Sequence, residues 1–539
     1  AWAGIGTETE EVVVQHGEVL RLAPDDLVAS ASAPQACKTV SVDEFLRQTK
    51  PAESGEAVFR AQPRDLDRET ITEGWNVGIP TVDALTPLGR GQSMLFCSPY
   101  VAQAAEHRDT LLLQILGGML GSPLNGDVHC WIKTERTPQA HKSGMRTSDV
   151  FDFASVDRAL AALPGKVSER VTLVHSEASR WEDAEVVSVL ASYISCSLAE
   201  RRSGSGGHAL LALPSLQAHY RVWRRAQRLA AAYYVQHAGG RLPPGLFGAG
   251  ADRAELRQFY SSLVQRSANL NEKCGGGSLS CLHGVFQGSQ PSNAAGITSE
   301  ASEDEERGFE LHELVSLSAS ELNRAKLLRD RGIKLTRSVL TKLGFKIPQT
   351  DAPGEAPALD ASKYMEDLDN NPVDESTLTQ HAEELKSISD GHIVTTWDGA
   401  FDFDITNSLT RIGIGINRNK SRDTRPFALR KVAGPLRLEL CQLADSDPAA
   451  VAHYARHIGR FADAVLLQGA RLSLVQEVII LTMLHMDVLA HPAKLAPRSL
   501  AQVHAIESEL DPALKRAIES NSKEDVDVAP IRKAVAANK

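Results

Sequence analysis

Histidines and cysteines are the residues of this chain most able to bind a metal ion. His453 and His457 are four residues apart, so a helix would place both side chains on one face. The glutamate of an HExxH zinc motif is absent, and the pair is therefore more typical of a solvated helix face. The seven cysteines include no CxxC pair and no cluster with zinc spacing: Cys37, Cys97, Cys130, Cys196, Cys274, Cys281 and Cys441. The sequence indicates small buried thiols and no metal site.

Two further patterns contain residues that could bind phosphate groups. The glycine-rich run 204–207 precedes a strand instead of joining a strand to a helix, which favours a flexible turn. The basic stretch 221–228 is short and helical, which is typical of a stripe that faces solvent or another subunit. The whole chain has 58 basic and 68 acidic side chains and thus lacks the positive field that holds a nucleic-acid backbone. Nucleic acid is not an expected partner.

The composition is that of a globular α/β protein. The chain has 539 residues, of which 42% are hydrophobic and 23% are charged. At roughly 150 residues per domain, this length predicts three or four domains. No stretch approaches the ~18 uncharged apolar residues of a membrane span, so direct membrane insertion is not expected. Aromatic residues make up only 5%, which favours aliphatic layers and helices over an aromatic-rich sandwich.

The pattern of apolar residues divides the first part of the chain into two regions. Short strand-like runs separated by Pro, Asp and Gly occupy 1–65 and predict a small β-barrel-like domain. Between about 90 and 285, buried-strand runs alternate with helical patterns, which predicts a parallel sheet with crossover helices. The predicted strands of this sheet are 93–97, 128–132, 171–174 and 209–213.

The second part of the chain begins with a change of composition. Residues 290–386 are rich in Ser, Pro, Asp and Glu and predict an insertion or linker with one helical island at 318–343. A β pattern returns at 388–416, and helices are predicted over 436–520. The last residues, 521–539, are predicted to form a polar tail that frays.

The segment 78–92, GIPTVDALTPLGRGQ, resembles the stretch GIxxVDxLxPIGRGQ of F-type ATP synthase α subunits. Further segments resemble motifs of this family in the family's order: 191–200, 207–211, 241–245, 275–279, 389–393 and 431–440. The resemblance implies an N-terminal β-barrel, a RecA-like domain made of 66–289 and 387–435, and a C-terminal helical bundle. It also implies that 290–386 is a lineage-specific insertion. In this family, α and β subunits alternate in a ring around a rotor.

The phosphate-binding loop that the resemblance implies is altered. A phosphate cradle needs glycines, a lysine for the phosphate charge and a Ser or Thr hydroxyl for magnesium. The family has GDRQTGKT at this place, whereas this chain has SPYVAQAA at 98–105. Gln103, Ala104 and Ala105 therefore stand where Gly, Lys and Thr are expected. Tyr100 is one side chain that could occupy the space.

The strand that should carry the magnesium-organising carboxylates is altered as well. Residues 209–213 are followed by Pro214 and Ser215 in place of the acidic pair. A triphosphate and its metal would leave several charges uncompensated in such a site. We therefore expect neither ATP with magnesium nor any other cofactor to bind, and no metal site.

One catalytic feature of the family has a counterpart in this chain. The α subunit of the family sends an arginine, from the sequence VSRVGSAAQ, to the phosphates held by a neighbouring β subunit. Arg418 matches this arginine if one residue is inserted before Val432. The residues that follow Arg418 differ from the family's VGSAAQ, and a surface arginine on a loop is the alternative interpretation.

The sequence thus favours a non-catalytic structural or regulatory α-like subunit of an F-type ATP synthase, which is no enzyme by itself. Its expected partners are the β subunit and other subunits of the catalytic head or the peripheral stalk. Its expected place is the matrix face of the mitochondrial inner membrane, with the stromal side of the thylakoid as the alternative. Two other hypotheses remain open: an assembly factor that mimics α to hold β, and a true α equivalent that supplies Arg418 to a β site.

Overall fold

The computed structural model describes the parallel sheet that the sequence predicts, together with helices that pack against it. The described residues are 21–22, 37–42, 56–135, 153–161, 167–176, 184–237, 249–287, 326, 362, 365, 375–397, 401–411, 423–434, 472–486, 488, 496–521 and 526–538.

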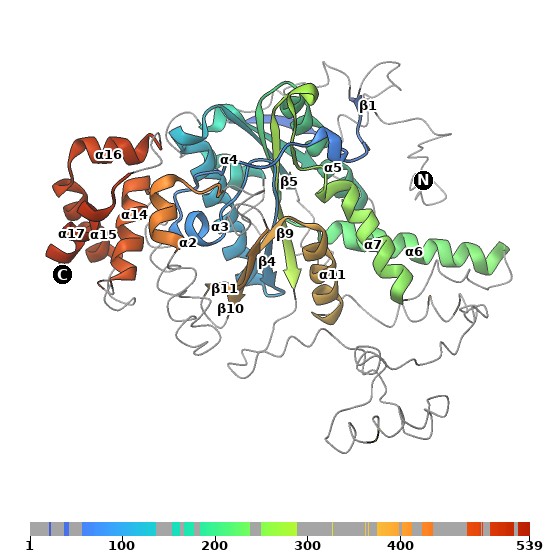
Figure 1. The fold of residues 1–539 in the computed structure, drawn as a ribbon. Helices are drawn as coiled ribbons and strands as arrows, with labels where there is room; N and C mark the ends of the chain where they lie inside the picture. The colour runs from blue at the N-terminus through green and yellow to red at the C-terminus, as the bar shows by residue number, and fades with distance from the viewer. Residues whose placement is uncertain are drawn as a thin grey trace.

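A nine-stranded sheet forms the centre of the molecule, with the strand order β11-β10-β4-β9-β7-β5-β6-β2 and β8 paired to β9 (Figure 1). All neighbours are parallel except β10 with β11 and β8 with β9. This mostly parallel order confirms the predicted α/β class, and all four predicted strands are present. The strands are β2 (Lys38–Ser41), β4 (Ser93–Pro99), β5 (Val128–Glu135), β6 (Val171–Ser176), β7 (His208–Leu213), β8 (Ala268–Asn269), β9 (Ser278–Gln287), β10 (Gly391–Trp397) and β11 (Phe401–Thr410).

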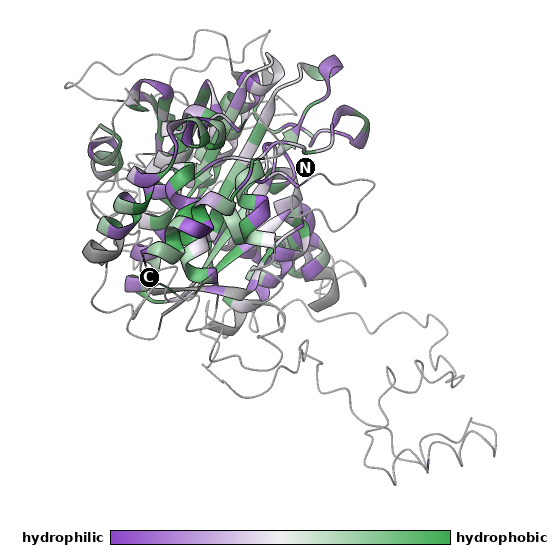
Figure 2. Cartoon of the chain, turned by 60° about the vertical axis from the view of Figure 1, so that its left-hand side comes forward, coloured by the Kyte–Doolittle hydropathy of each residue, from purple (hydrophilic) through white to green (hydrophobic). Residues whose placement is uncertain are grey.

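Helices cover both faces of the sheet, as parallel strands require. One face packs against α3 (Ala102–Gly121) and α4 (Phe153–Ala161). The other packs against α5 (Ala184–Gly204), α6 (Gln217–His237), α7 (Ala249–Val264) and α11 (Glu375–Ile388). Figure 2 shows the apolar residues gathered on the strands and on the inner sides of the helices. The core is therefore two aliphatic layers separated by the sheet.

The predicted end of the insertion 290–386 differs from the structure. Helix α11 begins inside this insertion, yet its Leu378, Ala382 and Leu385 are buried against the body. The folded body therefore returns at 375, where apolar side chains recur at helical spacing. Of the predicted helix 318–343, the structure describes only Lys326.

The N-terminal region contributes to the large sheet. Strand β2 pairs in parallel with β6, so part of the predicted barrel 1–65 belongs to the α/β body. Two short strands, β1 (Arg21–Leu22) and β3 (Glu56–Ala57), form a separate antiparallel pair. Residues 1–20, 23–36 and 43–55 of the predicted barrel lie outside the described ranges.

Four helices near the C-terminus share a core with α2 (Pro80–Leu85). They are α14 (Leu474–His485), α15 (Ala496–Glu509), α16 (Pro512–Glu519) and α17 (Ala529–Ala537), and Figure 1 places them at the opposite end of the molecule from α6. Helix α17 lies in the predicted polar tail 521–539. Its Ile531 and Val535 are buried because their four-residue spacing puts both on one helix face.

The segment 78–92 folds around a buried carboxylate. Asp83 accepts hydrogen bonds from the backbone N–H groups of Val77 and Gly78 at 2.8–3.0 Å, and the side chain of Asn76 also donates to it. Asn76 donates to Glu477 of α14 at 3.4 Å as well. The motif thus fixes the turn before α2 and joins it to the C-terminal helices.

Helix α3 approaches this turn closely at Gly118. A Cβ atom added at Gly118 would lie 1.8 Å from the carbonyl oxygen of Val77, which is backbone and cannot rotate away. We expect Gly118→Ala to lower the free energy of unfolding by roughly 2–3 kcal/mol, because α3 must shift away from the turn. Gly204→Ala is the matched control, since no atom lies within 4 Å of its added Cβ. Urea unfolding of both variants measures the difference, and equal midpoints would contradict the expected clash.

Candidate functional site

The carboxyl ends of parallel strands are where open α/β sheets bind their ligands, and here this edge is formed by β4, β9 and β7. Strand β4 ends at Pro99 and α3 begins at Ala102, so only Tyr100 and Val101 join them. Gln103, Ala104 and Ala105 form the first turn of α3, where Ala104 and Ala105 are buried and Gln103 is exposed. A loop that could wrap a phosphate has no room in this connection.

Arg108 fills the space beside this connection. It lies in the second turn of α3, and its side chain is only 1% exposed although it carries a full charge. The guanidinium donates from Nη1 to Ser98 Oγ at 3.3 Å and from Nη2 to the carbonyl oxygen of Pro214 at 3.1 Å. Ser98 lies at the end of β4, and Pro214 directly follows β7. One side chain thus connects the ends of two strands that are separated by β9.

Asp109 supplies the counter-charge of Arg108. Its Oδ1 atom accepts from Nε at 2.9 Å and from Nη2 at 2.7 Å. Burial raises the pKa of Asp109 to about 6, against the opposing effect of the neighbouring guanidinium. The pair is therefore a buried ion pair whose carboxylate depends on Arg108 to stay charged.

Aromatic rings cover the outer side of the guanidinium. The Cζ atom of Arg108 lies 4.6 Å from the centre of the Phe286 ring, a cation–π contact at the end of β9. Tyr100 packs edge-on against Phe286 with ring centres 5.3 Å apart, but 46% of Tyr100 is exposed. Tyr100 therefore lies at the rim of the space, and Arg108 with Phe286 occupies it.

The end of β7 approaches β9 closely. A Cβ atom at Gly284 would lie 1.8 Å from the carbonyl oxygen of Pro214 and 3.3 Å from Arg108 Cζ. The backbone N–H of Leu216 also donates to the carbonyl oxygen of Gly284 at 3.0 Å. Between His208 and Leu216 there is no carboxylate. The carbonyl oxygen of Pro214, which accepts a hydrogen bond from Arg108, lies at the position where a carboxylate that organises magnesium is expected.

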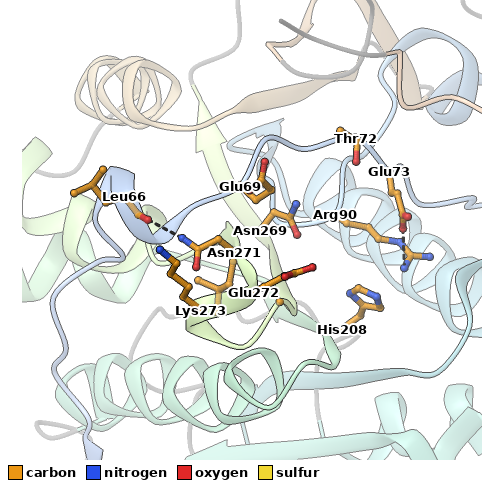
Figure 3. A pocket seen from close by; sticks show the side chains of 12 residues that line it. Leu66, Glu69, Thr72, Glu73, Arg90, His208, Asn269, Asn271, Glu272 and Lys273 are labelled. Carbon is orange, nitrogen blue, oxygen red and sulfur yellow. Dashed lines mark hydrogen bonds and ion pairs between the residues drawn. The ribbon is translucent and has the colours of Figure 1, made fainter.

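A pocket opens at the opposite edge of the sheet, near the start of β7. Its volume is about 690 Å³, and Figure 3 shows polar side chains of both charges around it. Arg90 and Glu73 form an ion pair of 3.3 Å on one side, where burial lowers the pKa of Arg90. His208 donates to or accepts from Ser278 at 2.9 Å. The lining residues are Leu66, Glu69, Thr72, Glu73, Arg90, His208, Asn269, Leu270, Asn271, Glu272, Lys273 and Gly276.

Comparison with curated proteins identifies a set of relatives for this chain. An ATP synthase subunit α of Dehalococcoides mccartyi is 27% identical over 231 residues, which are 43% of this chain and 39% of that protein. The corresponding subunit of Mycolicibacterium smegmatis is 28% identical over 232 residues, and the mitochondrial one of Dictyostelium citrinum is 29% identical over 227 residues. The chain is similar to ATP synthase α subunits. The match spans 42–43% of this chain and 37–39% of these three relatives, and no family model matches the chain.

The structure places only part of the site that the sequence predicts. Gln103, Ala104, Ala105 and Pro214 come together at the carboxyl edge of the sheet, around Arg108. Arg418, His453 and His457 lie outside the described residues. Within the described ranges, no group of three or more His, Cys, Asp or Glu side chains is placed to hold a metal.

Sequence reasoning missed Arg108, although a signal for it exists. The buried positions of α3 recur at helical spacing, and Arg108 lies four residues after Ala104 and four before Leu112, on the same apolar face. A charged residue on such a face must find a partner inside the protein.

Among the helices that the structure describes, none is long and apolar enough to cross a membrane.

Proposed function

We propose that this chain is a non-catalytic α-like subunit of an F-type ATP synthase, with a structural or regulatory role. The similarity to α subunits supports the connection to the complex. The observation that carries the non-catalytic part is Arg108, whose guanidinium lies at the carboxyl edge of the sheet where a bound nucleotide would need space.

The described residues at this edge do not fit ATP with magnesium. A triphosphate needs backbone N–H groups, a lysine and a hydroxyl, but the first turn of α3 offers Gln103, Ala104 and Ala105. Magnesium needs oxygen ligands that are usually carboxylates, and Pro214 directly follows the end of β7. The carboxylate of Asp109 lies beside Arg108, where it would repel a phosphate. We infer that the site has no nucleotide-dependent chemistry.

Isothermal titration of the purified chain with ATP and magnesium tests this inference. We expect no binding heat at sub-millimolar ATP, because the guanidinium of Arg108 and the carboxylate of Asp109 at this edge are already paired with each other. An ATP synthase α subunit with an intact phosphate-binding loop is the positive control. A dissociation constant in the micromolar range would contradict the proposal.

The proposed partners are the β subunit and other subunits of the catalytic head or the peripheral stalk, on the matrix side of the mitochondrial inner membrane. Affinity purification of the tagged chain from mitochondria should recover the whole synthase at a fixed stoichiometry. Recovery of β alone, without the rotor and membrane subunits, would favour an assembly factor and contradict a resident subunit. Recovery from plastids would contradict the proposed location only.

A further inference from the structure

The guanidinium of Arg108 has the arrangement of a bound ligand. Four hydrogen bonds connect it to Asp109, to Ser98 and to the carbonyl oxygen of Pro214, and the Phe286 ring covers its face. These partners come from α3, β4, β7 and β9. With only 1% of the residue exposed, water has almost no access to the group.

We propose that Arg108 is a built-in ligand, which occupies a guanidinium-binding site and keeps the ends of β4, β7 and β9 in one closed arrangement without any nucleotide. This deepens the proposed function and rests on it, since it describes how the former nucleotide edge is kept closed. The chain would then hold a single conformation while nucleotides exchange elsewhere in a complex.

The contacts make the closure permanent. A guanidinium has five N–H donors in a rigid planar fork, and four hydrogen bonds already use most of them. An entering phosphate would have to break these bonds and would then face the Asp109 carboxylate, which is 2% exposed. Both steps oppose binding of an anion.

The same contacts define what the site would accept if the side chain were removed. Arg108→Ala leaves a space bordered by the Asp109 carboxylate, the Ser98 hydroxyl, the Pro214 carbonyl oxygen and the Phe286 ring. A small guanidinium cation matches these groups, because it is planar, positively charged and able to donate to two acceptors at once. Ethylguanidinium is the fragment that the substitution deletes.

The first experiment measures the melting temperature of Arg108→Ala with increasing millimolar ethylguanidinium. We expect the substitution to lower the melting temperature by roughly 10 °C, because it removes the guanidinium that compensates the charge of the buried Asp109 carboxylate. Ethylguanidinium should restore at least half of the lost melting temperature in a saturable way. Ethylammonium has the same charge but lacks the planar set of N–H donors, and it should not restore the melting temperature. The unchanged chain should show no recovery. Equal effects of the two cations, or a melting temperature close to that of the unchanged chain, would overturn the proposal.

A second experiment begins with the unchanged chain, and this part of it does not depend on whether the variant folds. Hydrogen–deuterium exchange should show strong protection at 98–101, 214–217 and 285–287, with no change when ATP and magnesium are added. In Arg108→Ala, protection should fall at all three segments together. Low protection at these segments in the unchanged chain would overturn the built-in ligand. If nucleotide bound while ethylguanidinium rescue still succeeded, the proposed function would fail and the guanidinium site would stand.

Discussion

Acidification from about pH 7 to about pH 5 should lower the free energy of unfolding by roughly 6 kcal/mol through three buried histidines. His219, His283 and His381 are at most 2% exposed. Burial lowers the pKa of His283 and of His381 to about 3, and it lowers the pKa of His219 well below its usual value. The loss is comparable to the total stability of a typical domain, which is about 5–15 kcal/mol.

The sign follows from the direction of these shifts. In the unfolded chain a histidine takes up its proton near pH 6.5, whereas burial lowers the pKa of folded His283 and His381 to about 3 and lowers that of His219 well below its usual value. Stability is therefore complete above about pH 6.5 and decreases as the pH falls below it, by up to about 1.4 kcal/mol per histidine and pH unit.

The surroundings of the histidines offer little to offset a positive charge. Besides burial, the groups that disfavour protonation of His219 are Lys133 on β5, His283 on β9 and His381 on α11, all of which can be cationic. His381 Nε2 lies 2.6 Å from the Tyr260 hydroxyl on α7, and the two ring centres are 5.0 Å apart. Both ring nitrogens of His219 and of His283 lack a hydrogen-bond partner among the described residues.

Urea unfolding followed by circular dichroism at several pH values measures the effect. His283→Leu should reduce the slope below about pH 6.5 by up to about 1.4 kcal/mol per pH unit, because it deletes one buried histidine. His504→Gln is the matched control, since that side chain is 55% exposed on α15. A stability that stays constant between these pH values would show that the cluster does not control acid unfolding.

Replacement of Arg266 should have the second-largest effect, a loss of about 3–5 kcal/mol for Arg266→Met. Its guanidinium is fully buried and binds both carboxylate oxygens of Glu200 at 2.6 Å. It also donates to Ser197 Oγ at 2.9 Å and to the carbonyl oxygen of Val58 at 3.1 Å. Methionine fills a similar volume but leaves Glu200 charged and without its main partner.

A double variant separates charge from packing in this experiment. Arg266→Met with Glu200→Gln removes both charges and should recover much of the lost stability, because the uncompensated carboxylate causes most of the cost. The exposed Arg64, which pairs with Asp67 at 3.0 Å, gives the control, and Arg64→Met should leave the unfolding midpoint unchanged. If Arg266→Met lowered the free energy of unfolding no more than Arg64→Met does, the buried ion pair would not stabilise the fold.

The sequence predicted the strands well because their signal is local. Residues 93–97, 128–132, 171–174 and 209–213 are apolar runs bounded by polar residues, and each became a strand of the parallel sheet. The sequence does not predict helix α17, because only two of its residues, Ile531 and Val535, are buried. The mean composition of 521–539 is polar and does not reveal them. The N-terminal strand β2 was assigned to a barrel because its partner β6 is distant in sequence.

Of the candidate site, the sequence predicts only which phosphate-binding and magnesium-binding residues are absent. The replacement of Gly, Lys and Thr by Gln103, Ala104 and Ala105 is visible by counting along the chain. The role of Arg108 is not, because its partners Pro214 and Phe286 are brought to it only by the strand order β4-β9-β7. A buried charge on an apolar helix face indicates that a partner exists but not where it lies.

The position of β10 in the sheet has a consequence for synthesis of the chain on the ribosome. Strand β4 needs β9 on one side and β10 on the other, and its residues are all buried in the finished sheet. β10 begins at Gly391, so translation from the end of β4 takes on the order of 15–60 s at bacterial to eukaryotic elongation rates. During this interval one edge of β4, whose residues are all buried in the finished sheet, lacks its neighbour, and the nascent chain needs a chaperone or another transient partner at this edge.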